Sequence, residues 1–122
     1  MNQPAHNSPR KPKAAFTLVE IMIAVVIIGL LASIAMPAFK KIRDSSQDKA
    51  VLNNARQLAG AADQYMMETG KSSVLVTALI GATSYIKSLD TIAGETYPTA
   101  ITQGQAITVS GVAGQRTITY TP

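Results

Sequence analysis

The stretch that decides the fold is Phe16-Thr17-Leu18-Val19-Glu20, followed by the apolar run Ile21–Phe39. Within that run only Ser33 is polar, and no residue is charged. The nineteen residues of the run would rise about 28 Å as a helix, which is close to the thickness of one bilayer core. The run therefore predicts a membrane-spanning helix that carries a carboxylate at its start.

That carboxylate, Glu20, is costly where it stands. An ionised glutamate just inside a span costs about 2.5–3.5 kcal/mol on insertion scales, so such a residue usually has a partner. A cut between Ala15 and Phe16 would put a new amino terminus four residues before Glu20, on the same helix face. The resulting cation and anion would lie at one depth and could pair within a chain or between neighbours.

The apolar run continues without a turn signal into residues 40–69. Arg43–Lys49 is polar all round and is expected to cross the water interface. Beyond it, apolar residues recur every three or four positions and predict a helical stripe. Gly70 is a suitable residue to end the helix. We expect one helix from about Phe16 to Thr69, with this stripe: Val51, Ala55, Leu58, Ala62, Tyr65 and Met66.

Two residues weaken the membrane half of this helix. Pro37 removes the backbone hydrogen bond to Ser33, and Gly29 lowers the helix propensity. Proline is tolerated in membrane helices, so a simple kink and a functional unwinding site are both open.

The fold class predicted for residues 16–122 is α+β, with the long N-terminal helix packed on a small antiparallel sheet. Alternating apolar residues in three segments, 97–101, 107–109 and 118–120, predict three short strands whose apolar face lies on the helix stripe. Pro98 would suit an edge or the start of a strand.

The segment between the helix and these strands is less regular. Thr77 is expected to cap a single helical turn that ends at Gly81. The apolar residues that we expect in the core of this segment are Leu79, Ile80, Tyr85, Ile86 and Leu89.

Four segments follow from this pattern. Residues 1–15 form a polar leader that is expected to be disordered, and 16–39 form the transmembrane half of the helix. Residues 40–70 form its amphipathic half, and 71–122 a small globular head.

Charge and composition narrow the function. The net charge is +4, but three of the eleven basic residues lie in the leader: Arg10, Lys11 and Lys13. Without them eight basic residues face seven acidic ones. The head contains only three basic residues, Lys71, Lys87 and Arg116. They form no cluster interleaved with aromatic residues, so the sequence does not support nucleic-acid binding.

No catalytic constellation is visible, so the chain is not expected to be an enzyme or to hold a cofactor. There is no cysteine, which excludes disulfides and thiol catalysis. The one histidine, His6, lies in the leader. Asp90 and Glu95 are the only carboxylates after Glu68, too few for a calcium site, and no metal is expected.

The order of these features resembles the N-terminal region of the type IV pilin and pseudopilin superfamily. The resemblance covers about Lys13 to Gly70: a basic leader, a small residue, the motif Phe16–Glu20, and an apolar helix with an amphipathic continuation. In the head it extends only to a small sheet on a long helix.

The resemblance implies roles for five residues. Ala15 and Phe16 would flank the site cut by a prepilin peptidase, which would also methylate the new amine of Phe16. Glu20 would be the assembly glutamate that pairs with that amine on an adjacent subunit. Gly29 and Pro37 would bound the segment that loosens when the subunit leaves lipid. The family usually has glycine where Ala15 stands, and alanine is also small enough for a tight protease subsite.

The implied function is that of a structural filament subunit. The small head and the lack of a disulfide loop favour a type II secretion pseudopilin over a surface type IV pilin that serves adhesion, motility or DNA uptake. Major pseudopilins often carry calcium in the head, and too few ligands are present here. The implied partners are copies of the chain, minor subunits, the prepilin peptidase, and an inner-membrane assembly platform with its ATPase.

The resemblance places the leader in the cytoplasm and the head in the periplasm, with the helix in the inner membrane. After assembly the subunit would lie in a periplasmic pseudopilus or a surface pilus. Charge alone does not orient the helix, because three basic residues precede the run and three follow it: Arg10, Lys11, Lys13, and Lys40, Lys41, Arg43.

An ordinary secretory signal is the alternative for the apolar run. Ser33-Ile34-Ala35 fits a small-x-small cleavage site, and the product would be a small secreted protein. The run, however, is longer than the 7–15 apolar residues typical of such signals, and Glu20 stands near its start.

Overall fold

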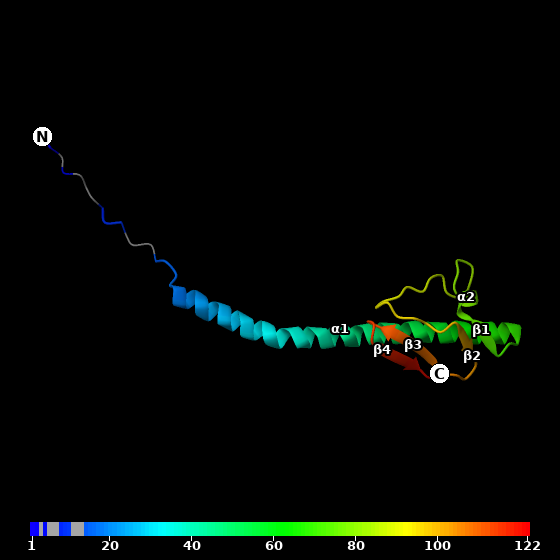
Figure 1. Cartoon of the computed structure of the whole chain (residues 1–122). Coiled ribbons are helices and arrows are strands. Elements are labelled where there is room, and N and C mark those ends of the chain that lie inside the picture. The colour runs from blue at the N-terminus through cyan, green and yellow to red at the C-terminus, as the bar shows by residue number, and fades with distance from the viewer. Residues whose placement is uncertain (3, 5–7, 11–13) are drawn as a thin grey trace. The chain divides into compact units, whose positions relative to one another are not determined.

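The computed structural model describes residues 1–2, 4, 8–10 and 14–122. The chain divides into two compact units, Met1–Ala38 and Phe39–Pro122. Its elements confirm the predicted α+β class (Figure 1). In chain order they are α1 (Leu18–Thr69), β1 (Ser73–Leu75), α2 (Val76–Leu79), β2 (Ala100–Thr102), β3 (Ile107–Val112) and β4 (Arg116–Tyr120).

The first unit contains the leader and the start of α1. The helix begins at Leu18, two residues later than expected. From there to Phe39 the large apolar side chains are exposed around the whole helix, and α1 is long and apolar enough to cross a membrane. The leader residues His6, Lys11, Pro12 and Lys13, on which part of the expected leader rests, lie outside the described residues.

In the second unit α1 buries one stripe of side chains. Five of the six residues predicted for the stripe are buried, and Ala59 and Ala61 join them. Tyr65 is only partly buried, at the edge of the core. Because helical residues three and four positions apart share a face, this spacing in the sequence was sufficient to identify the buried side.

Gly70 ends α1, as predicted. Its N–H donates to the carbonyl oxygen of Met66 at 2.8 Å, and its φ of +69° lies in the left-handed region. Glycine adopts this conformation without the steric cost that a Cβ brings, which suits it to the position after a helix.

The strands form two small antiparallel sheets rather than one. β1 pairs with β2, with Val74 opposite Ile101, and β3 pairs with β4, with Val109 opposite Ile118. β1 lies in a segment for which the sequence predicted no strand. Inward-facing residues of the strands pack with the stripe of α1 in one core, among them Val74, Ile101, Ile107, Val109 and Val112.

Backbone contacts outside the strands connect the rest of the head. Thr96 pairs with Ser110 through two hydrogen bonds of 2.7 and 3.1 Å, which attaches the segment before β2 to β3. Ala113 and Gly114 turn the chain between β3 and β4, both with positive φ (51° and 79°).

The segment 72–89 differs from its prediction. Thr77 does not cap a helix: α2 starts at Val76, after an extended Leu75 that makes no capping hydrogen bond, and ends at Leu79. Its position is set by a contact with a distant part of the chain, since the Val76 N–H donates to the carbonyl oxygen of Thr99, just before β2, at 2.9 Å.

Four of the five core residues predicted in this segment are at least partly buried: Leu79, Ile80, Ile86 and Leu89. Tyr85 is exposed, so its prediction is wrong. Its hydroxyl donates to the carboxylate of Glu68, and its ring meets that of Tyr65 edge-on, with 6.1 Å between centroids. A tyrosine can bury one ring edge while its hydroxyl stays at the surface.

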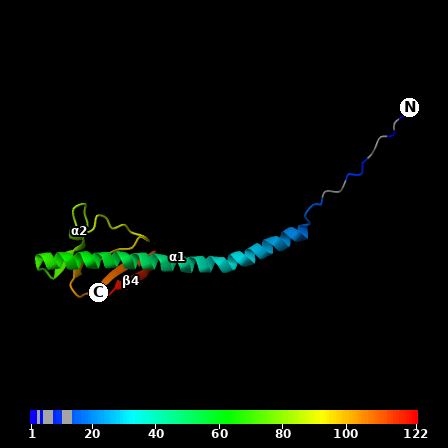
Figure 2. The same ribbon diagram turned by 180° about the vertical axis from the view of Figure 1, so that it is seen from behind.

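Within the second unit, α2 and the residues after it run along one side of α1, while β3 and β4 lie along another. The view from behind shows the same arrangement (Figure 2). The helix therefore contributes to the core from the middle of the head.

Candidate functional site

Glu20 lies in the first turn of α1 and forms a reciprocal pair with Thr17. The Thr17 N–H donates to Glu20 Oε2 at 2.9 Å, and the Glu20 N–H donates to Thr17 Oγ1 at 3.2 Å. This arrangement is a capping box, which satisfies N–H groups that have no partner inside the helix. It explains why α1 begins at Leu18 and not at Phe16.

The sequence contained the signal for this cap. A Thr-x-x-Glu pattern before an apolar run is typical of a capping box, and Thr17 and Glu20 have that spacing.

The predicted cleavage site lies directly before the cap. Ala15 and Phe16 are exposed and belong to neither helix nor strand. A peptide bond in this position is accessible to a protease that binds extended chain. In the uncut chain Phe16 is still joined to Ala15, so its nitrogen is an amide and carries no charge for Glu20 to pair with.

Gly29 and Pro37 are connected through Ser33, which lies four residues from each. The hydroxyl of Ser33 donates to the carbonyl oxygen of Gly29 at 2.8 Å. Pro37 has no N–H to offer to the carbonyl of Ser33. A hydroxyl bonded back to a carbonyl four residues earlier often bends or weakens a helix. The segment is nevertheless α-helical throughout.

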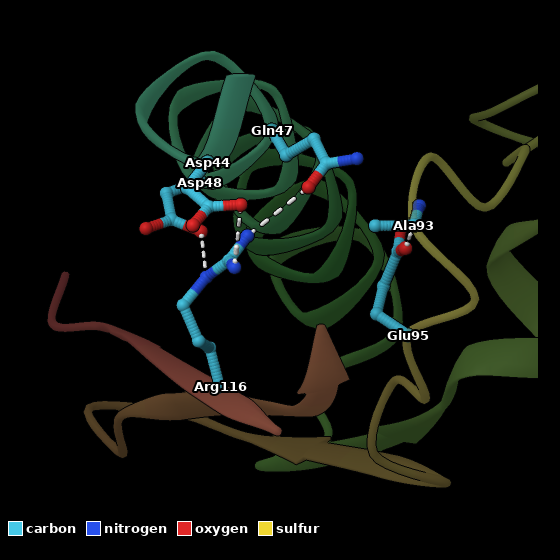
Figure 3. A network of polar contacts seen from close by, with 6 residues as sticks. All are labelled: Asp44, Gln47, Asp48, Ala93, Glu95 and Arg116. Carbon is cyan, nitrogen blue, oxygen red and sulfur yellow. Dashed lines mark hydrogen bonds and ion pairs between the residues drawn. The ribbon is translucent and has the colours of Figure 1, made fainter. Parts of the chain in front are cut away.

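Arg116, at the start of β4, binds three side chains of α1 (Figure 3). Its Nε lies 2.9 Å from Asp48 Oδ1, one terminal nitrogen lies 3.0 Å from Asp44 Oδ1, and the other donates to Gln47 Oε1 at 3.1 Å. The hydrogen bond to Asp48 and the charge of Asp44 raise the pKa of Arg116 above its ordinary value, although partial burial of the guanidinium works in the opposite direction. From the sequence, Arg116 is identified only as one of the three basic residues of the head.

Glu95 is the buried carboxylate of the head, with 4% of its surface exposed. It accepts hydrogen bonds from the N–H of Ile92 at 3.0 Å, the N–H of Ala93 at 2.7 Å and the hydroxyl of Tyr97 at 2.8 Å. Burial opposes ionisation, but the backbone hydrogen bonds from Ala93 and Ile92 outweigh it and lower the pKa of Glu95. The carboxylate thus stabilises the loop formed by residues 92–97 through hydrogen bonds within it. Figure 3 shows its contact with Ala93.

Asn54 joins this loop to α1. Its side-chain nitrogen donates to the hydroxyl of Tyr97 at 2.9 Å and to the carbonyl oxygen of Asp90 at 3.2 Å. Burial raises the pKa of Tyr97 to about 12; the hydrogen bond from Asn54 works against this shift, and the neighbouring Glu95 adds to it. Tyr97 therefore stays neutral, and its hydroxyl accepts a hydrogen bond from Asn54 of α1 while it donates one to Glu95.

These contacts bear on whether the acidic residues of the head could bind a metal ion. Glu95 is occupied by hydrogen-bond donors. Among the described residues no group of three or more histidine, cysteine, aspartate or glutamate side chains could hold a metal ion.

Comparison with known proteins bears on the N-terminal half. Residues 10–36 match a family model described as the prokaryotic N-terminal methylation motif. The chain is 38% identical over 61 residues to the fimbrial protein EcpC of Eikenella corrodens, which is 50% of this chain and 40% of that protein. No solved structure matches the chain.

Two further relatives carry different functional names. The type II secretion system core protein G of Klebsiella michiganensis is 32% identical over 62 residues (51% of this chain, 44% of that protein). The type IV major pilin protein PilA of Myxococcus xanthus is 40% identical over 58 residues (48% of this chain, 26% of that protein). The chain thus covers less than half the length of these relatives.

These matches show that the N-terminal half of the chain is similar to that of type IV pilins and type II secretion pseudopilins. The family resemblance predicted from the sequence is confirmed. The relatives include both pilins and pseudopilins, so similarity does not choose between them.

The capping box yields a prediction for Thr17→Val, which keeps the side-chain shape and removes the hydroxyl. Loss of a cap of this kind costs about 1 kcal/mol. We expect amide hydrogens of residues 18–21 to exchange about fivefold faster in detergent micelles, measured by NMR. Thr69→Val, at the other end of α1, is the control and should leave these amides unchanged. Equal exchange in both variants would contradict the cap.

The head yields a prediction about pH. The folded pKa of Glu95 lies below its ordinary value of 4.5, so the unfolded chain binds more protons in that range. The head should therefore lose stability as the pH falls from about 4.5 through the folded pKa. In Glu95→Gln this part of the pH dependence should vanish, with a loss of about 1–3 kcal/mol at pH 7. Urea unfolding of the full chain in micelles at several pH values measures both.

Asp90→Asn is the matched control for Glu95→Gln, because it removes a carboxylate from the same loop. It should keep the steep pH dependence of the original chain. Parallel curves for Glu95→Gln and the original chain would show that Glu95 is not the group responsible.

Proposed function

We propose that this chain is a structural subunit of a type IV pilus-like filament, cut between Ala15 and Phe16 and methylated on the new amine of Phe16. The observation that carries the proposal is Glu20 at the start of an apolar helix whose first residues match the methylation motif. The exposed, non-helical backbone at Ala15 and Phe16 supports it, because a peptidase needs such a substrate.

Cleavage turns a neutral amide into an ammonium group beside Glu20. In the bilayer, lipid solvates the apolar side chains of α1. In a filament the same surface packs on neighbouring helices, and the pair of Glu20 with the Phe16 amine of an adjacent subunit is sheltered from water. A buried ion pair determines register and orientation more reliably than it adds stability. Glu20 thus acts as the assembly residue.

The capping box is compatible with this pairing. Its hydrogen bond to the carboxylate uses Oε2. An ionised carboxylate has about four acceptor positions on its two oxygens, so an ammonium group can bind without displacing the Thr17 N–H. Glu20 can then hold the helix start of its own chain and the terminus of a neighbour together.

Gly29 and Pro37 have a role in leaving the membrane. The hydrogen bond from Ser33 to Gly29 and the missing N–H of Pro37 lower the cost of opening this segment. We propose that the helix loosens there when the subunit moves from lipid into the filament, where neighbouring helices constrain its path.

The partners follow from this role: further copies of the chain, minor subunits, a prepilin peptidase, and an inner-membrane platform driven by an ATPase. Before assembly the leader lies in the cytoplasm and the head in the periplasm. The apolar helix, by length and composition, supports the membrane location.

A type II secretion pseudopilin is the form that we favour, in line with the protein G relatives, because the head is small and has no cysteine. A surface type IV pilin is the second candidate, supported by the relatives named fimbrial protein and PilA.

The central test is Glu20→Ala in cells that make the filament. Removing one partner of a buried ion pair costs about 3–5 kcal/mol, so we expect at least about a tenfold loss of filament with normal insertion of the subunit. Electron microscopy of sheared filaments and membrane fractionation measure the two. Asp63→Ala, which removes an exposed carboxylate further along α1, is the control. Normal filament yield from Glu20→Ala, or a purified subunit that retains residues 1–15, would contradict the proposal.

Deletion of the gene separates the two candidates. For a pseudopilin we expect proteins that are normally exported to accumulate in the periplasm, while surface filaments persist. For a surface pilin we expect the filaments to disappear, while export continues. Fractionation and microscopy of one deletion strain read out both.

A further inference from the structure

Two lysines and two serines line a hollow on α1 shortly after the apolar run. Its lining residues are Lys41, Ile42, Ser45, Ser46 and Lys49, and none of them is acidic. Lys41, Ser45 and Lys49 are spaced by four residues, so they lie along one face of the helix. The short serine between the two lysines leaves room for a group that is bound by both.

The acidic residues among these lysines are engaged elsewhere. Asp44 and Asp48 lie 3.0 and 2.9 Å from nitrogens of Arg116. Over residues 14–122 as the structure describes them, the ion pairs of this part of α1 are those that Arg116 makes. Arg116 of β4 thus pairs with both carboxylates, and Lys41 and Lys49 keep their positive charge exposed.

The hollow follows the apolar run closely, so a bilayer centred on that run would have its lipid headgroups near the hollow. Lys41 comes two residues after Phe39, which places it about 3 Å along the helix axis from the end of the run. The polar layer of a bilayer is roughly 5–8 Å thick on each side. Lys49 starts further out, but helical side chains lean toward the N-terminus, here back toward the membrane, and lysine stems extend along apolar surface.

We propose that this hollow binds the phosphate of an anionic phospholipid headgroup. Lys41 and Lys49 supply the charge, and the hydroxyls of Ser45 and Ser46 donate hydrogen bonds to the phosphate oxygens. Ile42 contacts the glycerol and the first acyl carbons. This concerns a single subunit in the membrane, so it holds or fails independently of polymerisation and of cleavage at Ala15.

The test uses the full chain in nanodiscs of phosphatidylcholine, with and without phosphatidylglycerol. Native mass spectrometry measures how much phosphatidylglycerol the protein retains. A basic residue near an anionic surface is worth about 1 kcal/mol, so Lys41→Gln and Lys49→Gln should each weaken retention about fivefold. Lys87→Gln, in the head, is the matched control and should retain as much lipid as the original chain. Equal retention by all three variants would overturn the proposal.

A second variant distinguishes a specific binding site from general electrostatic attraction of the lysines to an anionic membrane surface. Ser45→Leu fills the hollow and leaves the net charge unchanged. We expect it to weaken retention at least fivefold, whereas Asn53→Leu, an exposed position further along α1, should not. Unchanged retention by Ser45→Leu would show that the lysines act only as general surface charge, and the site would be rejected.

Two other occupants are outcomes of the same test. If the protein retains inorganic phosphate at millimolar concentration but no phosphatidylglycerol, the hollow binds free anions and not lipid. If Ser45→Cys forms disulfides between copies in phosphatidylcholine alone as readily as with phosphatidylglycerol, this face joins two copies of the chain. Either result overturns the lipid assignment; retention that persists, with crosslinking suppressed by phosphatidylglycerol, supports it.

Discussion

One helix in this protein must suit two surroundings, and the rest of the structure depends on that constraint. Up to Phe39, α1 exposes apolar side chains on every side, which only lipid or other helices can cover. Beyond Arg43–Lys49 it buries a single stripe that supplies much of the core of the head. Because a head of about fifty residues can bury little apolar surface by itself, it needs this stripe.

Polar groups in the apolar half are each given a local partner. Glu20 and Thr17 satisfy one another at the helix start, and Ser33 returns its hydroxyl to the carbonyl of Gly29. Such pairing lowers the cost of keeping these groups away from water. It also leaves Glu20 able to accept a further donor, so the same residue can serve the folded subunit and the proposed filament.

Local periodicity made much of the fold predictable. The long helix, its buried stripe and its end at Gly70 all follow from residues a few positions apart, which is the range over which a helix is stabilised. The short elements were not predictable in this way. β1 has three residues and depends on β2, and α2 is positioned by the carbonyl of Thr99 rather than by a cap at Thr77.

By itself the sequence determined the apolar helix, the position of Glu20 beside a potential new terminus, and the resemblance of this half to pilins and pseudopilins, because these depend on spacing along one helix. Only the tertiary structure decided which head residues meet α1. Arg116 binds Asp44 and Asp48 across more than sixty positions of chain, and Asn54 reaches Tyr97. Contacts between such distant residues depend on how the chain folds back onto the helix, and the spacing of side chains along the sequence does not reveal this.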